Sequence, residues 1–482
     1  MFILFFYFVF LFYLLILYIH IYMTDSIIYE NDYDNILKII KKKLSVNVSK
    51  KELYGEVFTP IIFIEEIMNN IPNNIWNDPN LKWLDPACGI GNFPIIIYKK
   101  LMNTLKNYNK NGLNLTDKYK RHRHIINNMI YMVEIENDNV SSCYKIFGKE
   151  SNIYKGSFLN NSKQINDDIL KYFSINKFDI IIGNPPYQNE RIKKKGTTAG
   201  RSKIWDSFVK NSFNILKDDG FLCFIHPSSW RGPQNKLWDL MKNKQIIYLH
   251  LYSVKDGQNI FNVGTRFDLY VLHNKPTYKK TKVIDEVNKH HKILLNKLPF
   301  LANYNYHILN KIITTEENGV DVIFDTFYHS SDSIGNTKKN KDANYNKPVV
   351  HSVNKHGLGL IYTNKKVGHF GKPKVILNSN IIQYSYPEQN DYTGKYGMSQ
   401  LSFGLPIKSK KEGDDILNII DTDVFKQIIK STKWSLFQTD YKMFKYFKKD
   451  WYKILKKERG TGTKKIVTNN INKKRFTQKL KK

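Results

Sequence analysis

The sequence predicts an α/β protein with a mostly parallel main sheet, followed by a second domain of α+β type. Over roughly the first 275 residues, short apolar runs typical of buried strands alternate with helical segments. Glycine or proline turns directly follow two of these runs, as expected where parallel strands end at a ligand site. After residue 275 the pattern becomes polar and irregular and then helical.

Composition and charge narrow the classes of function. The chain has 482 residues, 41% of them hydrophobic, and a formal net charge of +32. This length and hydrophobic content allow two or three packed domains and exclude a disordered protein. The charge favours a nucleic-acid partner, although a Lys-rich composition from an AT-rich genome is the alternative. Cys88, Cys143 and Cys223 form no CxxC pair, which argues against a disulfide framework or a zinc site.

The first 22 residues are apolar and long enough to span a bilayer, and they lack a basic n-region and a cleavage site. Two interpretations remain. In the first, residues 1–22 are a membrane anchor. In the second, translation starts at Met23, and AT-rich upstream DNA has been read as apolar codons. The second interpretation is favoured, because a chain that begins MTDSIIYEN has an ordinary soluble start.

The expected elements follow from periodicity and from helix and turn signals. Helices are expected over residues 34–70, with an interruption at 54–60, and over 93–105, 205–216, 414–430 and 439–449. Strands are expected over 82–85, 128–136, 178–182, 221–227 and 267–274. The helix at 205–216 has one apolar face and is closed by KDDG, and polar or basic loops fill 107–124 and 188–202. The basic tail from residue 460 has no apolar periodicity and is expected to be disordered.

Three stretches at strand ends carry candidate chemistry. In DPACGIGNF, Gly89 and Gly91 allow close approach of a ligand, but the spacing fits neither GxGxxG nor a P-loop, and a plain tight turn is the alternative. Glu134 ends the second strand, where a carboxylate can accept hydrogen bonds from ribose hydroxyls, with Glu136 as a second candidate. A solvated strand end is the alternative there.

The third stretch is NPPY. Asn184 offers a side-chain carbonyl, Pro185 offers a backbone carbonyl, and the two prolines add no N–H. Such a turn can accept hydrogen bonds from an amino group on a planar ring, and Tyr187 offers a ring on which a base can stack. A simple strand-ending turn is the alternative.

The stretches YGEVFTP, DPACGIGNF and NPPY occur in this order and resemble the N6-adenine DNA methyltransferases of the gamma arrangement. The resemblance covers about residues 54–274 and continues, less specifically, through stretches that resemble the recognition regions of type II restriction-modification methylases: HFGKPKVILNSN, GKYGMSQ and IIKSTKWSLFQTDYKMFKYF. It implies a class I S-adenosylmethionine methyltransferase fold with a Rossmann-like seven-stranded sheet and a C-terminal α+β target-recognition domain. The expected domains are a hydrophobic segment (1–22), a catalytic domain (23–275), a target-recognition domain (276–459) and a basic flexible tail (460–482).

The resemblance also implies roles for individual residues. The cofactor S-adenosyl-L-methionine would be bound by Tyr54, Thr59, Asp85, Pro86, Ala87, Gly89, Gly91, Glu134 and Ser157. The catalytic residues would be Asn184, Pro185, Pro186 and Tyr187, which hold an adenine flipped out of the duplex while its N6 amine takes the methyl group. Family members usually carry an acidic residue at the position of Ser157, where it contacts the adenine of the cofactor. A serine can still hydrogen-bond that amine, but the departure leaves the cofactor affinity open and leaves room for a degenerate enzyme.

The expected partner is double-stranded DNA, recognised sequence-specifically by a monomer, with a cognate restriction endonuclease as a further partner and no metal. The loop after NPPY carries five basic residues that would contact phosphates, unless they form a plain solvated face: Arg191, Lys193, Lys194, Lys195 and Arg201. Arg231 is a weaker candidate for DNA contact. RNA adenine methylation, protein glutamine methylation and a DNA-binding pseudoenzyme remain alternative functions. The expected location is the cytoplasm, or wherever the target DNA lies, with membrane anchoring as the alternative.

Overall fold

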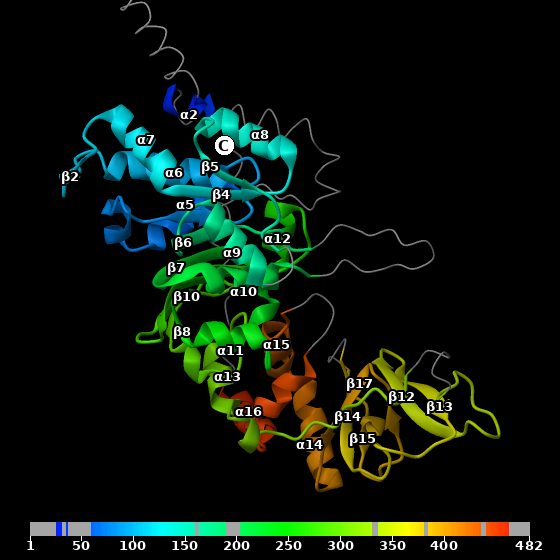
Figure 1. Cartoon of the computed structure of the whole chain (residues 1–482). Helices are drawn as coiled ribbons and strands as arrows, with labels where there is room; N and C mark the ends of the chain where they lie inside the picture. Colours follow the sequence, from blue (N-terminus) through cyan, green and yellow to red (C-terminus); the bar gives the residue numbers. More distant parts are fainter. Residues whose placement is uncertain are drawn as a thin grey trace, which may run out of the picture. The chain divides into compact units, whose positions relative to one another are not determined.

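The computed structural model describes residues 26–30, 35–36, 59–159, 163–188, 203–329, 336–379, 384–434 and 440–461 (Figure 1). The chain divides into two compact units. Unit 1 comprises Met1–Leu298 with Trp434–Leu436, and unit 2 comprises Pro299–Lys433 with Phe437–Lys482. Within the described ranges, no helix is both long and apolar enough to cross a membrane, and the hydrophobic segment 1–22 lies outside them.

Among the described residues of unit 1, nine strands form one sheet in the order β11-β10-β8-β9-β7-β6-β1-β4-β5. Their bounds are β1 (Trp83–Asp85), β4 (Ile130–Glu134), β5 (Asn152–Lys155), β6 (Phe178–Gly183), β7 (Leu216–Pro227), β8 (Lys244–Tyr252), β9 (Phe267–Pro276), β10 (Thr281–Ile284) and β11 (His290–Ile293). The pairs from β5 to β7 are parallel, and β9 runs antiparallel to both β7 and β8. The predicted α/β class is therefore confirmed.

The seven strands from β5 to β8 correspond to the predicted seven-stranded sheet, and β10 and β11 extend its edge. The predicted domain boundary at residue 275 therefore falls before two strands that belong to this sheet. From β1 the chain proceeds to β4 and β5 on one side and to β6 and β7 on the other. The strand order thus reverses between β1 and β6, and such a reversal opens a crevice beyond the carboxyl ends of the strands.

The helices of unit 1 connect these strands. They are α2 (Ile27–Glu30), α5 (Ile61–Asn70), α6 (Asn92–Thr104), α7 (Lys118–Asn128), α8 (Asn137–Phe147), α9 (Lys163–Tyr172), α10 (Trp205–Ile215), α11 (Lys236–Lys242) and α12 (Val254–Phe261). Helix α10 buries the predicted apolar face, and the hydroxyl of its buried Ser212 donates to the carbonyl of Phe208 (2.7 Å). The predicted KDDG stop is wrong, because α10 ends at Ile215 and Leu216 already begins β7.

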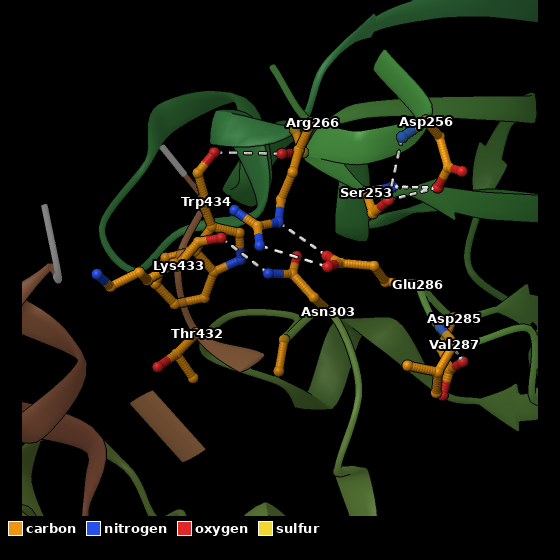
Figure 2. A network of polar contacts seen from close by, with 12 residues as sticks. Ser253, Asp256, Arg266, Asp285, Glu286, Val287, Asn303, Thr432, Lys433 and Trp434 are labelled. Carbon is orange, nitrogen blue, oxygen red and sulfur yellow. Dashed lines mark hydrogen bonds and ion pairs between the residues drawn. The ribbon is translucent and has the colours of Figure 1, made fainter. Parts of the chain in front are cut away.

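A bidentate ion pair joins the added strands to β9. Nε and Nη2 of Arg266 donate to the two carboxylate oxygens of Glu286 at 2.8 and 3.3 Å, and Figure 2 shows the two side chains pointing toward one another. Glu286 lies in the turn between β10 and β11, and both side chains are largely buried. A two-pronged pair of this kind fixes orientation as well as distance, so it fixes the β10–β11 turn against the start of β9.

Unit 2 combines two small sheets with helices. Its elements are α13 (Tyr306–Ile312), β12 (Lys347–Asn354), β13 (Gly357–Thr363), β14 (Lys374–Asn378), β15 (Asn390–Asp391), β16 (Gly397–Met398), β17 (Ser402–Pro406), α14 (Lys410–Ile420), α15 (Asp423–Ser431), η7 (Tyr441–Tyr446) and α16 (Trp451–Thr461). The sheets have the orders β13-β12-β16 and β15-β14-β17, so the predicted α+β character is present. The predicted helix 414–430 is split in two, because Thr422 caps α15 by accepting from the N–H of Phe425.

One carboxylate fixes α5 to the sheet. Glu66 accepts hydrogen bonds from Tyr248 Oη (2.7 Å), His250 Nδ1 (2.6 Å) and Tyr252 Oη (2.7 Å). These three residues alternate along β8, so their side chains share one face of the strand. Burial alone would raise the pKa of Glu66, but the bonds from β8 hold this pKa below its ordinary value.

We expect Glu66→Gln to lower the free energy of unfolding by about 2 to 3 kcal/mol at neutral pH, because hydrogen bonds to a charged acceptor are lost. The folded pKa lies below the unfolded one, so this contribution is complete above about pH 4.3 and is lost as the pH falls through the folded pKa. Urea unfolding at pH 7 and at acidic pH measures both effects. Glu65→Gln, at an exposed position of the same helix, is the matched control. An equal effect of the two substitutions would contradict the role of Glu66.

Candidate functional site

Three polar side chains stand at the carboxyl ends of neighbouring strands on either side of the switch point. Asp85 is the last residue of β1, Glu134 is the last residue of β4, and Asn184 directly follows β6. These are the positions where parallel α/β sheets bind ligands. The sequence predicted all three as site residues, and the fold brings them to the same edge of the sheet.

The turn after β1 is shaped by its glycines. Gly91 has a φ of 90° and precedes α6, and a Cβ there would meet the ring of Phe147 at 2.7 Å. Gly89 has a φ of 55°, and its N–H donates to Glu134 Oε2 at 2.8 Å. The turn therefore requires glycine at position 91 for conformation and for space, and the backbone of Gly89 connects the ends of β1 and β4.

The carboxylate of Glu134 is already engaged by the backbone. Besides the bond from Gly89, its Oε1 accepts from the N–H of Glu136 at 2.8 Å, and the side chain is buried. A ribose would have to share these oxygens with two backbone N–H groups, which a carboxylate with about four lone-pair positions can accommodate. Glu136 itself acts as the N-terminal flank of α8.

Asp85 is almost completely buried, and its Oδ1 accepts from the N–H of Ala87 at 3.1 Å. The pKa of Asp85 is raised to about 8: burial is the main cause, the bond from Ala87 opposes the shift, and the charge of Glu134 adds to it. Within the described residues, Asp85 forms no ion pair with a cation. A Cβ on Gly183 would lie 2.8 Å from Asp85 Oδ1, so the last residue of β6 has to be glycine for this carboxyl to fit.

The amide of Asn184 is oriented by one bond, and its oxygen is left without a partner among the described residues. Its Nδ2 donates to Oγ1 of the buried Thr59 at 3.0 Å. Its Oδ1 is buried and has no hydrogen-bond partner among the described residues. Such an oxygen usually has a partner, because leaving it without one costs about 1 to 3 kcal/mol. An acceptor is therefore held ready beside the switch point.

The aromatic residue of NPPY has a buried hydroxyl, although the residue as a whole is only partly buried. The hydroxyl of Tyr187 has no hydrogen-bond partner in the described part of the chain, while the residue as a whole is of intermediate exposure. Burial raises the pKa of Tyr187 well above its ordinary value, and the nearby charge of Asp268 adds to this effect. The polar end of Tyr187 is thus buried without a partner among the described residues, while other atoms of the residue remain partly exposed.

A buried polar cluster lies near Tyr187. Asp268 Oδ2 accepts from Trp230 Nε1 and from Arg231 Nε, both at 2.7 Å, and all three side chains are buried. The predicted contact of Arg231 with DNA is therefore wrong, because this guanidinium is 1% exposed and paired inside unit 1. Sequence reasoning missed Asp268, although a lone carboxylate inside the apolar run RFDLYVL is a recognisable signal. Gly183 was not predicted either, although a glycine that directly precedes Asn184 at the end of a strand could have indicated it.

For the other predicted site residues, the structure shows few contacts that bear on ligand binding, or it does not describe the residue. Ser157 follows β5, and its hydroxyl accepts from the N–H of Leu159 at 3.0 Å. Pro86 and Pro185 are buried beside Asp85 and Asn184, and Pro186 is half-exposed. The remaining candidates lie outside the described residues: Tyr54, Arg191, Lys193, Lys194, Lys195 and Arg201.

Comparison with known proteins gives a consistent set of relatives. The chain is 24% identical to an uncharacterized adenine-specific methylase of Mycoplasma pneumoniae over 303 residues, which cover 48% of this chain and 67% of that protein. It is 26% identical to the modification methylase CviBIII of Paramecium bursaria Chlorella virus NC1A over 288 residues, which cover 55% and 63%. It is 25% identical to the type II restriction enzyme and methyltransferase RM.Eco57I of Escherichia coli over 392 residues, which cover 66% and 38%. The chain thus spans about two thirds or less of each relative.

Among solved structures, the Type IIL restriction-modification enzyme MmeI in complex with DNA aligns at a TM-score of 0.47 and 11% identity, over 82% of this chain and 68% of that one. The M protein of the Type I restriction enzyme EcoKI aligns at 0.35 and 17%, over 47% and 48%. The fold assignment rests on the strand order described above. Residues 34–261 match the family model described as Eco57I restriction-modification methylase. This segment, just under half of the chain, is therefore similar to the Eco57I restriction-modification methylase family.

Proposed function

We propose that the chain is a site-specific DNA methyltransferase that transfers a methyl group from S-adenosylmethionine to the N6 amine of an adenine rotated out of the duplex. One observation carries this proposal furthest. The buried Oδ1 of Asn184 has no hydrogen-bond partner within the described residues, and it stands at the end of β6 beside the switch point. An amino group on the ligand would supply the missing donor.

The residues at the switch point fit the proposed cofactor. Asp85 offers a carboxyl whose pKa is raised chiefly by burial and which has no cationic partner among the described residues, so it suits the ammonium of an amino-acid group. Thr59 and Ser157 offer hydroxyls, and Glu134 offers carboxylate oxygens for ribose hydroxyls. At Pro86, Ala87, Gly89 and Gly91 the backbone can approach the cofactor closely. When bound, S-adenosylmethionine supplies a methyl group on a positively charged sulfur.

The protein's own contribution to the reaction is to position the amine. Asn184 Oδ1 and the carbonyl oxygen of Pro185 accept the two amine hydrogens, which draws the nitrogen lone pair out of the ring. Neither Pro185 nor Pro186 has an N–H that would compete for these acceptors. Stacking on the ring of Tyr187 stabilises the base by about 1 to 3 kcal/mol and offsets the few kcal/mol that rotation out of the duplex costs. No strong base is needed, because the amine becomes acidic once it is alkylated.

The direct test is to express the chain from Met23 in a host without adenine methylation and to sequence the host DNA with a method that reports modified bases. The expected result is N6-methyladenine at one recurring short sequence. Unmodified DNA, together with a folded protein that binds the cofactor, would leave a DNA-binding pseudoenzyme. Methylation confined to RNA or to protein glutamine would favour the rival methyltransferases. A cognate restriction endonuclease remains a proposal that this experiment does not address.

Asn184→Ala is expected to lower methyl transfer to the cognate duplex by about 100-fold or more, since one of two preorganised acceptors is removed. Binding of S-adenosylhomocysteine, measured by calorimetry, should be largely unchanged, because Asn184 faces the base. Asn128→Ala, at an exposed position of α7, should leave both properties as in the parent chain. Substantial transfer by the Asn184 variant would refute the acceptor role.

The affinity for S-adenosylhomocysteine is expected to rise between pH 6 and about pH 8, by up to about tenfold per pH unit, and then to level off. The reason is that the ligand's ammonium binds the ionised form of Asp85, whereas the free protein holds this carboxyl protonated below its raised pKa. Calorimetry in buffers of different ionisation enthalpy should detect proton release on binding. Asp85→Asn should weaken binding and flatten the profile. A flat profile in the parent chain would contradict the assignment of Asp85.

A further inference from the structure

Two loops of unit 2 lie against each other and carry both apolar and basic exposed side chains. The first, residues 364–372, connects β13 to β14, and the second, residues 392–396, connects β15 to β16. We call them the paired loops. Among the described residues of unit 2, the exposed large hydrophobic side chains are Phe327, Val367 and Tyr392. Two of the three belong to the paired loops, and the third is adjacent to a residue that holds the first loop.

That neighbouring residue is Tyr328, which is fully buried. Its hydroxyl lies 3.2 Å from the carbonyl oxygen of Lys365 and 3.0 Å from that of Val367, and it accepts from the N–H of Val367 at 2.9 Å. The exposed part of the first loop is therefore fixed by its backbone. Its side chains project from a rigid support, which is the condition for a surface that recognises shape.

The paired loops also carry four exposed lysines: Lys365, Lys366, Lys372 and Lys395. None of them forms an ion pair with a residue that the structure describes. Two acidic residues lie beside the loops: Asp391 is buried against Lys374, and the partly exposed Asp325 lies 2.8 Å from His369 Nε2. The surface therefore presents four lysine charges, none of them paired with a carboxylate among the described residues, against one partly exposed acidic side chain, Asp325.

A buried ion pair joins the two loops from beneath. Lys374 is 0% exposed, and its Nζ donates to the carbonyls of His369 (3.0 Å) and Lys372 (3.2 Å) in the first loop and to Asp391 Oδ2 (2.7 Å). Asp391 in turn accepts from the N–H groups of Lys395 (2.7 Å) and Tyr396 (3.0 Å) in the second loop. A single pair of charges thus sets the spacing of both loops.

The loops meet backbone to backbone at two glycines. The N–H of Gly371 donates to the carbonyl of Gly394 at 2.9 Å, and both residues have positive φ, 73° and 69°. A Cβ on Gly394 would lie 2.6 Å from Gly371 Cα. This contact requires glycine at position 394, and it brings the lysines of the two loops onto one continuous surface.

We propose that the paired loops form the surface of unit 2 that enters a groove of double-stranded DNA, a proposal that rests on the proposed function. Lys365, Lys366, Lys372 and Lys395 contact phosphates, while Val367 and Tyr392 contact base edges. Isolated apolar side chains on a rigid basic surface suit this task, since they can contact thymine methyl groups or base steps while the lysines fix the register. A protein partner would favour a larger apolar patch with fewer lysines.

The charge part of the proposal is tested with the full chain from Met23 and a duplex of arbitrary sequence. The loop variant carries Lys→Ala at positions 365, 366, 372 and 395. The control variant loses the same charge elsewhere in unit 2, in α15, α16 and the turn before α16, by Lys→Ala at positions 430, 449, 453 and 457. Binding is measured by fluorescence anisotropy over a range of salt concentrations. The loop variant should lower the slope of log K against log salt by about 3 to 4, because each phosphate contact contributes about 0.9. The control variant should keep most of the slope.

The apolar part is tested with Val367→Ser and Tyr392→Ser on the methylated sequence identified in host DNA and on a scrambled duplex. Each substitution should lower the ratio of the two affinities by about fivefold or more, with an unchanged salt slope. Circular dichroism verifies that every variant is folded. Asn364→Ser, an exposed neighbour in the same loop, should keep the ratio of the parent chain.

The outcomes separate the two proposals. If the parent chain methylates DNA and the loop variant keeps its affinity and salt slope, the paired loops are not the DNA surface and the proposed function stands. If the parent chain binds neither duplex, the proposed function fails. If the variants bind DNA as the parent does but lose a protein that copurifies with the parent, the surface serves that protein and the inference is overturned.

Discussion

The candidate site depends on an oxygen that the fold keeps without a donor. Leaving Asn184 Oδ1 buried and unpartnered within the described residues costs about 1 to 3 kcal/mol, which a fold usually avoids. The amide cannot easily turn away to relieve this cost, because Nδ2 is bonded to Thr59 and the next two residues are prolines. Thr59 belongs to the segment before α5, so the position of α5 sets the direction of the Asn184 amide. The hydrogen bonds between Glu66 and β8 therefore support the site from a distance.

A second constraint operates on the other side of β1. The N–H of Gly89 and the carboxylate of Glu134 join two strand ends, and the absence of a Cβ on Gly183 leaves space for the buried carboxyl of Asp85. Acceptor groups from three strands thus converge where cationic and amino groups of ligands are expected. Burial is the main cause of the raised pKa of Asp85, the charge of Glu134 adds to it, and no described cation pairs with Asp85, so the site without ligand has a deficit of positive charge. Binding a cation relieves this deficit, which links stability of the site to occupancy.

Site residues could be predicted from the sequence where a polar side chain directly ends an apolar run. Asp85, Glu134 and Asn184 could be selected because an apolar run stops at each of them, and parallel topology alone brings such ends together. The sequence was uninformative where contacts join distant positions. Glu66 is separated from its partners on β8 by more than 180 residues, and β8 itself was not predicted. Arg231 was misassigned because an arginine after a proline turn resembles a surface residue until its buried partner Asp268 is known. Lys374 is likewise indistinguishable from its solvated neighbours in HFGKPK, although it alone is fully buried among those lysines.

The close approach of Gly371 and Gly394 has a consequence for how such proteins diverge. Position 394 admits no side chain, and Lys374 with Asp391 must persist as a pair, so the framework under the loops is intolerant of change. The side chains at positions 365–367 and 392–393 are exposed, and they take no part in the contacts that hold this framework together. Point substitutions there alter what the surface offers while the framework stays intact. On the proposed role of the paired loops, single substitutions at these positions change the sequence preference while the protein stays folded.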